Sequence, residues 1–105
     1  MAQFTAYRNP NSANRASIPL LLDIQSELIA TLQTCVVIPL YTEVAMKGNI
    51  LKTLTPVLAI DGKRYVMVTP QLAGIPRHLL GAPAADLSAH RADILAALDM
   101  LVSGI

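Results

Sequence analysis

Short segments that are apolar, or that alternate between apolar and polar positions, follow one another along most of the chain. Residues 3–8 alternate and carry the β-favouring Phe, Thr and Tyr, which predicts a half-buried first strand. Residues 19–24 predict a short second strand. Residues 34–40 are apolar almost throughout, as expected for a central strand covered on both faces. The pattern therefore predicts a mainly β domain.

The clearest local signal is a β-hairpin. Two β-favouring segments, residues 55–60 and 63–68, flank the dipeptide Asp61-Gly62. Asp-Gly readily adopts the positive φ angles of a two-residue hairpin turn. With the three segments before it, this hairpin brings the predicted number of strands to about five.

Proline, glycine and asparagine mark the breaks between these segments. Residues 9–14 gather turn-forming side chains and predict a flexible loop of about ten residues. Residues 43–54 show no clear period and are also predicted to form a loop, as are residues 81–85. Two prolines and a glycine in residues 69–76 predict a turn and a short extended piece. Pro39 cannot donate a ladder hydrogen bond, so the central strand should end, bulge or lie at an edge there.

The period changes near the C-terminus, where residues 89–102 predict one helix. Asp86 or Ser88 should cap its first turn, and Gly104 should end it. The face expected to pack on the core carries Leu87, Ile94, Leu98 and Leu101. The opposite face, expected to meet solvent or a partner, carries Asp93, Ala96, Asp99, Met100 and Ser103.

The composition is that of one small domain with too few charges for its surface. The 105 residues leave room for a single domain, residues 1–105, in which 53% of residues are hydrophobic and 14% are charged. Average soluble domains carry about 25% charged residues. We therefore expect an apolar interface, and a homodimer is the simplest way to cover it.

Several classes of protein are disfavoured. The longest apolar runs, residues 18–22 and 35–40, are far shorter than the roughly 20 residues of a membrane span. The first residues show no secretory signal, so we expect a cytoplasmic protein. Cys35, the single cysteine, is expected to be a small buried hydrophobe. The net charge is +1 and the cations are scattered, with Lys63-Arg64 the one adjacent pair, so direct binding of nucleic acid is not expected.

The chemistry-bearing residues favour a binding module over an enzyme. His78 and His90 have no partners at metal-ligand spacing, and the isolated glycines form no phosphate loop. We therefore predict neither a metal nor a cofactor. The end of the chain, Ser103-Gly104-Ile105, follows the predicted helix without a linker, so it either forms a rigid apolar binding surface or packs on its own domain. The apolar pair Leu28-Ile29 is either core or contact surface.

Several motifs in combination resemble the CcdB family of toxins. They are Gln3-Phe4, Asp23-Ile24-Gln25-Ser26-Glu27-Leu28-Ile29, Val37-Ile38-Pro39-Leu40, Ala85-Asp86-Leu87-Ser88 and Gly104-Ile105. The resemblance spans nearly the whole chain. It implies an SH3-like small barrel with a C-terminal helix, a fold that CcdB toxins share with MazF toxins, and a cytoplasmic homodimer.

The resemblance also implies a function. CcdB toxins belong to type II toxin–antitoxin pairs that serve plasmid maintenance. They bind the A subunit of DNA gyrase, trap it on cleaved DNA and are neutralised by a CcdA-like antitoxin. Such a poison stabilises one state of another enzyme and catalyses nothing itself. Operator DNA is bound only through the antitoxin, which also regulates transcription.

The family's contact residues can be carried over by position. For gyrase they are Leu28, Ile29, Asp99, Val102, Ser103, Gly104 and Ile105. For the antitoxin the candidates are the loop 9–16 and the region 41–51. Val102 and Ile105 would supply apolar contact, and the Ile105 carboxylate could accept hydrogen bonds.

Two departures from the family pattern keep alternatives open. The best-known member has tryptophan directly before Gly-Ile, where this chain has Ser103, and an uncharged amide at the position of Asp99. A central tryptophan commonly contributes about 2 kcal/mol or more, roughly thirtyfold in affinity. One alternative is therefore an inactive or retuned homologue that binds antitoxin without poisoning gyrase. Another is a MazF-like endoribonuclease, for which Arg77-His78 is the local cluster to test.

Overall fold

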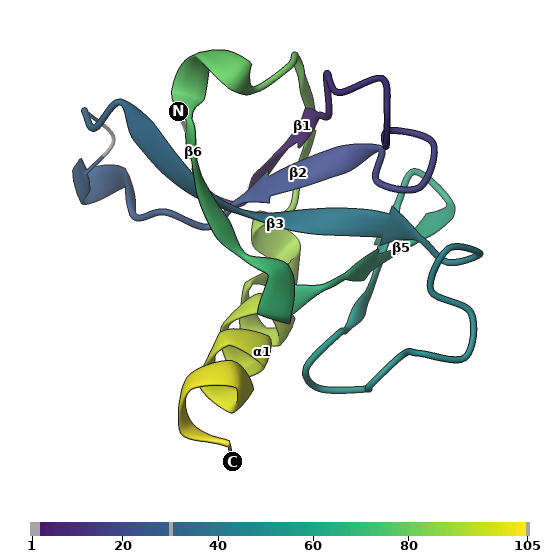
Figure 1. Cartoon of the computed structure of the whole chain (residues 1–105). Coiled ribbons are helices and arrows are strands. Elements are labelled where there is room, and N and C mark those ends of the chain that lie inside the picture. The colour runs from purple at the N-terminus through teal and green to yellow at the C-terminus, as the bar shows by residue number, and fades with distance from the viewer. Residues whose placement is uncertain (1–2, 30, 105) are drawn as a thin grey trace.

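The computed structural model describes residues 3–29 and 31–104 and confirms a mainly β fold with one C-terminal helix (Figure 1). The strands form one antiparallel sheet that curls into a half-barrel, and the helix packs against it. Within the described residues the sheet has seven strands, so the predicted number of about five is too low. The strands are β1 (Thr5–Arg8), β2 (Leu20–Asp23), β3 (Thr34–Thr42), β4 (Val57–Ile60), β5 (Lys63–Met67), β6 (Ala73–Pro76) and β7 (Pro83–Asp86).

The two strands beyond the prediction are β6 and β7. β6 is the short extended piece expected after a turn, here the 3-10 turn η2 (Thr69–Gln71), whereas β7 lies where a loop was predicted. Their sequences, Ala-Gly-Ile-Pro and Pro-Ala-Ala-Asp, carry little strand propensity. They are strands because β3 and β1 pair with them. Long-range pairing overrides local preference here.

The sheet is organised around β3. The strand order is β4-β5-β3-β2-β1-β7, and β6 also pairs with β3. One edge of β3 pairs with β2, while the other pairs first with β6, over Thr34 to Val37, and then with β5, over Leu40 to Thr42. The predicted hairpin is confirmed as β4 and β5, with positive φ at Asp61 (50°) and Gly62 (80°).

The central strand neither ends nor bulges at Pro39, and Pro39 does not lie at an edge, so that expectation is wrong. β3 continues through it to Thr42, and Pro39 lies opposite Leu21 in the interior of the sheet. The Pro39 carbonyl accepts a hydrogen bond from the Val68 N–H at 3.1 Å. In an antiparallel ladder the N and C=O of one residue point to the same edge. The nitrogen of Pro39, which carries no hydrogen, therefore faces the short gap between β6 and β5. No hydrogen bond of the sheet is lost there.

The core lies between the curled sheet and helix α1 (Arg91–Ser103). Its buried side chains are Phe4, Ala6, Leu20, Leu22, Ile38, Leu40, Leu58, Ile60, Met67, Leu87, Ile94 and Ala97. Neighbouring residues of a strand point to opposite faces. Val37 and Ile38 are both buried, at 3% and 0% exposure, so the prediction that this strand is covered on both faces is confirmed.

The start of the helix differs from the prediction. A 3-10 turn, η4 (Ser88–His90), precedes α1, which begins at Arg91. Asp86 Oδ1 accepts the Ser88 N–H at 2.9 Å where the chain enters this turn, but neither predicted residue caps α1 itself. The Ser88 hydrogen bonds lower the pKa of Asp86 below its ordinary value. Helix α1 ends at Gly104 as predicted, in the left-handed conformation at φ 73°.

The buried stripe of the helix is shorter than predicted. Ile94 and Ala97 are buried and Leu98 is partly buried, but Leu101 is 36% exposed. Figure 1 shows the last turns of α1 extending beyond the strands of the sheet.

The predicted loop at residues 9–14 is built from asparagine-bonded turns. Asn9 is buried, and its side-chain amide donates to Asn14 Oδ1 and to the Ile18 carbonyl, both at 2.8 Å. The Asn11 Oδ1 accepts the Ala13 N–H at 2.9 Å. These local bonds give the segment a defined shape next to the sheet.

Candidate functional site

The first candidate surface is the apolar pair Leu28-Ile29, on the 3-10 turn η1 (Glu27–Ile29) between β2 and β3. The turn is closed by Ser26, whose Oγ accepts the Leu28 N–H at 3.2 Å and whose carbonyl accepts the Ile29 N–H at 3.1 Å. Leu28 is 95% exposed and Ile29 is 45% exposed. The pair is therefore contact surface and not core. We call it, with the exposed Leu32 of the same segment, the η1 surface.

Leu32 was missed by the sequence reasoning. It is 49% exposed, and its N–H donates to the Ile29 carbonyl at 3.2 Å, which places it in the turn that follows the pair. The signal for it was available, since Leu32 is an apolar residue between Thr31 and Gln33.

The second candidate surface is the end of α1, which we call the helix-end surface. Val102 is 85% exposed and Asp99 is also exposed. The Ser103 Oγ donates to the Asp99 carbonyl at 2.7 Å, and the Gly104 N–H donates to the Met100 carbonyl at 2.9 Å. These bonds close the end of the helix, where Val102 is the most exposed apolar side chain. Ile105, also predicted for this surface, lies outside the described residues.

The two surfaces do not meet within one chain. In Figure 1 the turn η1 and the C-terminal end of α1 lie on well-separated parts of the molecule. The structure thus brings together Leu28, Ile29 and Leu32 on one side, and Asp99, Val102, Ser103 and Gly104 on the other. A single ligand that uses both must be large, or must bind across two copies of the chain.

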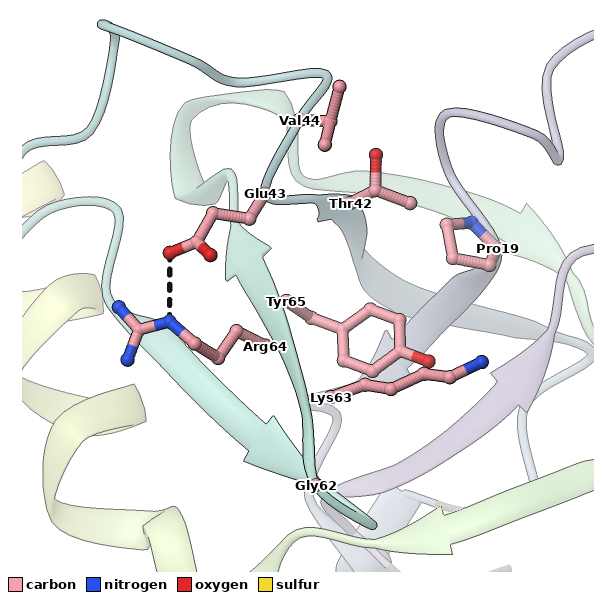
Figure 2. Close-up of a pocket in the computed structure, with 8 residues that line it drawn as sticks. All are labelled: Pro19, Thr42, Glu43, Val44, Gly62, Lys63, Arg64 and Tyr65. Atoms are coloured by element: carbon pink, nitrogen blue, oxygen red, sulfur yellow. Dashed lines mark hydrogen bonds and ion pairs between the residues drawn. The ribbon is translucent and has the colours of Figure 1, made fainter.

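A groove borders the region 41–51 (Figure 2). It has a volume of about 420 Å³ and is lined by Pro19, Thr42, Glu43, Val44, Gly62, Lys63, Arg64 and Tyr65. At its rim the Arg64 Nε donates to Glu43 Oε2 at 2.8 Å, and both side chains are well exposed. Figure 2 shows Lys63 stretched beside the Tyr65 ring, which leaves an apolar floor with a cation along it.

A second hollow borders the loop 9–16. It has a volume of about 470 Å³ and is lined by Asn9, Pro10, Asn11, Leu21, Ile75 and Leu79. Both segments predicted as antitoxin contacts therefore line concave surface, and the two hollows share no lining residue. The Thr42 N–H donates to the Ser17 carbonyl at 2.9 Å, so the chain that follows the loop 9–16 meets the start of the region 41–51.

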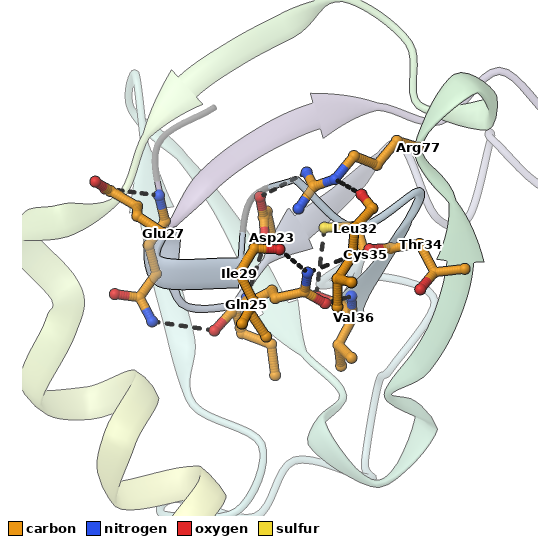
Figure 3. A network of polar contacts seen from close by, with 11 residues as sticks. Asp23, Gln25, Glu27, Ile29, Leu32, Thr34, Cys35, Val36 and Arg77 are labelled. Carbon is orange, nitrogen blue, oxygen red and sulfur yellow. Dashed lines mark hydrogen bonds and ion pairs between the residues drawn. The ribbon is translucent and has the colours of Figure 1, made fainter.

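Arg77 and His78, the cluster named for an RNA-cleaving site, line one hollow of about 370 Å³ but differ in their surroundings. The Arg77 Nε donates to the Leu32 carbonyl at 2.8 Å, and its Nη1 lies 3.9 Å from Asp23 Oδ2 (Figure 3). Its side chain is only 15% exposed. The guanidinium is thus directed into the protein, whereas His78 is exposed on the surface.

Cys35 lies in the same network and is fully buried, as predicted. Burial raises the pKa of its thiol, and Asp23 raises it as well through a hydrogen bond and its charge, so that together they bring the pKa to about 12. A thiol with so high a pKa is a poor nucleophile at neutral pH.

Residues 3–29 and 31–104 contain no group of three or more His, Cys, Asp or Glu side chains placed to hold a metal ion. In the same part of the chain, no helix has the length and apolarity needed to cross a membrane.

The comparison with known families agrees with the motifs. The family model of the CcdB protein matches residues 3–104. The chain belongs to the CcdB family. The match includes both candidate surfaces, except for Ile105, and both hollows. CcdB proteins are the toxins of toxin–antitoxin pairs, so this chain is a toxin of that kind.

The buried thiol of this CcdB protein makes a testable prediction about stability and pH. The folded state retains the Cys35 proton up to about pH 12, whereas an unfolded thiol loses it near about pH 8.5. The free energy of unfolding should therefore be unaffected by this group below about pH 8.5 and should fall as the pH rises toward the folded value. Between about pH 8 and about pH 10 we expect a loss of about 2 kcal/mol from Cys35.

Urea unfolding of the protein and of Cys35→Ala at both pH values measures this effect. Other groups also titrate in this range, so the quantity of interest is the difference between the two proteins. The Cys35→Ala protein should lose less stability on the change of pH. Equal losses in the two proteins would show that the thiol is not held protonated by the fold.

Proposed function

We propose that this CcdB protein binds the A subunit of DNA gyrase in the cytoplasm and traps the complex of gyrase with cleaved DNA. The observation that carries the proposal is the helix-end surface, where Val102 is 85% exposed at the end of a well-ordered helix. A side chain so exposed contributes nothing to the core, while buried apolar anchors supply much of the energy of protein–protein interfaces. The η1 surface, with Leu28 at 95% exposure, is the second contact.

The proposed gyrase contacts are the residues expected from the family. They are Leu28, Ile29, Asp99, Val102, Ser103, Gly104 and Ile105. Because the two surfaces lie apart in one chain, gyrase must contact an extended area, and a homodimer would bring a further copy of each surface to it.

A second candidate function is that of a homologue that binds antitoxin but poisons gyrase weakly or not at all. The observation that favours it is Ser103, which stands where the best-known member has tryptophan. The Ser103 hydroxyl donates to the Asp99 carbonyl of its own helix, so it offers no large apolar group to a partner. A loss of about 2 kcal/mol relative to a tryptophan anchor corresponds to roughly thirtyfold in affinity.

The proposed antitoxin is a CcdA-like protein whose disordered segment folds on binding. Its binding surface comprises the two hollows beside residues 9–16 and 41–51. We expect one extended segment of the antitoxin to occupy both hollows, which have no lining residue in common. We expect the antitoxin, and not this chain, to bind operator DNA, because the cations of this chain are scattered along its sequence.

We also propose that the protein is a homodimer. The chain has 14% charged residues, and its exposed apolar side chains include Leu95 at 40% and Leu101 at 36% on α1. Sedimentation at micromolar concentration should give twice the 11.2 kDa of the monomer. A concentration-independent monomer mass would contradict the proposal.

The gyrase proposal is tested by the products of gyrase itself. The protein is incubated with gyrase, supercoiled plasmid and ATP, and detergent then releases any trapped cleavage complex as linear DNA. The intact chain should yield linear DNA, and a variant that lacks Gly104-Ile105 should not, because the last two residues of the proposed contact are removed. No linear DNA from the intact chain, together with tight binding of the antitoxin, would favour the disarmed homologue.

A matched pair of point variants sharpens this test. Val102 and Val44 are exposed to nearly the same extent, 85% and 83%, but only Val102 lies on the proposed gyrase contact. The Val102→Ser change should weaken gyrase binding about tenfold, because burial of a valine contributes about 1.5 kcal/mol or more. The Val44→Ser change lies in the groove of Figure 2 and should leave the yield of linear DNA unchanged. Equal effects of the two changes would remove the helix end from the contact.

A further inference from the structure

The η1 surface stands on a segment with little packing of its own. Its described residues, 26–29 and 31–33, lie between β2 and β3 and are exposed, whereas Ile24 packs against the core and Gln25 is buried. Ser26, Glu27, Leu28 and Ile29 are exposed, and none of the residues of η1 is buried. Burial therefore does not hold this segment in one shape. Its shape depends on the polar contacts at its base, which Figure 3 shows.

Gln25 makes the first of these contacts. Its Nε2 donates to the carbonyls of Ile29 and Thr34, both at 3.2 Å, and its Oε1 accepts the Val36 N–H at 3.1 Å. Gln25 is 8% exposed, so these bonds are shielded from water. Its side chain joins η1 to the first residues of β3.

Arg77 makes the second contact from a distant part of the sequence. It begins the 3-10 turn η3 (Arg77–Leu79). Its backbone N–H donates to the Gln33 carbonyl at 2.8 Å, and its Nε donates to the Leu32 carbonyl at 2.8 Å. Its Nη1 faces the Asp23 carboxylate, which is buried at the end of β2. The guanidinium thus connects the far end of the segment to the strand from which the segment starts.

We propose that Arg77 is a positioning residue of the η1 surface, which holds Leu28, Ile29 and Leu32 in the arrangement that binds the partner. This inference rests on the proposed function, since the partner is the gyrase A subunit. The planar guanidinium suits the task, because it donates in fixed directions to a carbonyl and a carboxylate together. A surface held in its bound shape loses less conformational entropy when it binds.

The main test separates positioning from general stability. Arg77→Gln removes the charge that faces Asp23 and shortens the side chain. Arg77→Lys keeps the charge but loses the Nε donor to Leu32. Because Arg77→Gln leaves a buried carboxylate without its cation, the double change Asp23→Asn with Arg77→Gln removes both charges together. Ile60→Val, in the core at β4, lowers stability without touching the segment and serves as the control.

Hydrogen exchange of the protein alone is the first measurement. The N–H groups of Ile29 and Leu32 are bonded within the segment, so their exchange reports its local opening. In Arg77→Gln and in the double variant we expect exchange of residues 26–33 to be about tenfold faster, with little change in β1 to β5. Ile60→Val should not produce this local effect. Unchanged exchange of residues 26–33 in both Arg77→Gln and the double variant would overturn the proposal.

Binding to the gyrase A subunit is the second measurement. Arg77→Gln should weaken binding about fivefold or more, Arg77→Lys less, and Ile60→Val not at all while it remains folded. An equal loss of affinity in Ile60→Val would reduce Arg77 to a purely structural residue and overturn the proposal.

The two measurements also separate this inference from the proposed function. If the unaltered protein does not bind the gyrase A subunit, the proposed target is wrong, yet hydrogen exchange still decides whether Arg77 orders the segment. If the unaltered protein binds and the Arg77 variants bind equally well, the target stands and the positioning role is refuted.

Discussion

The Asp23 carboxylate is the constraint on which much of the molecule depends. It is 2% exposed at the end of β2, and a buried charge is tolerated only where polar partners surround it. Its Oδ1 accepts the Gln25 N–H at 2.9 Å, which turns the chain out of the sheet, and its Oδ2 faces Arg77. Removal of one partner alone would leave an uncompensated buried charge, which commonly costs about 3 kcal/mol or more. Satisfying this one group fixes the path between β2 and β3.

The same constraint links fold and function. The segment that leaves β2 carries Leu28 and Ile29 on its outer side, where they contribute nothing to the core. The polar groups at the base of the segment thus hold its path, whereas the apolar groups at its tip are exposed to solvent. A second exposed surface, at the end of α1, arises differently, because the helix extends beyond the sheet that would otherwise cover it. The chain belongs to a toxin family, and we propose that its exposed apolar side chains at both places contact a partner.

How far the sequence predicts this fold depends on whether each feature is local. The β4–β5 hairpin and the helix end at Gly104 were predictable, since each depends on a few adjacent residues with known φ preferences. Strand β7 was not, because only its pairing with β1 makes it a strand. The continuity of β3 through Pro39 was mispredicted. The sequence does not show that Pro39 faces the gap between β6 and β5, where no N–H is needed. Leu28 and Val102 were predicted as contacts, but the role of Arg77 was not, since its partners lie at Asp23 and Leu32.

The central claim is that gyrase A contacts the η1 and helix-end surfaces of this chain. Hydrogen exchange of the protein alone and saturated with the gyrase A subunit, read by mass spectrometry, tests it most directly. The account predicts slower exchange in residues 26–33 and 98–104 of the complex, with no change in the hairpin turn at residues 61–65. Protection confined to that turn and its groove, or no protection at either surface, would contradict it.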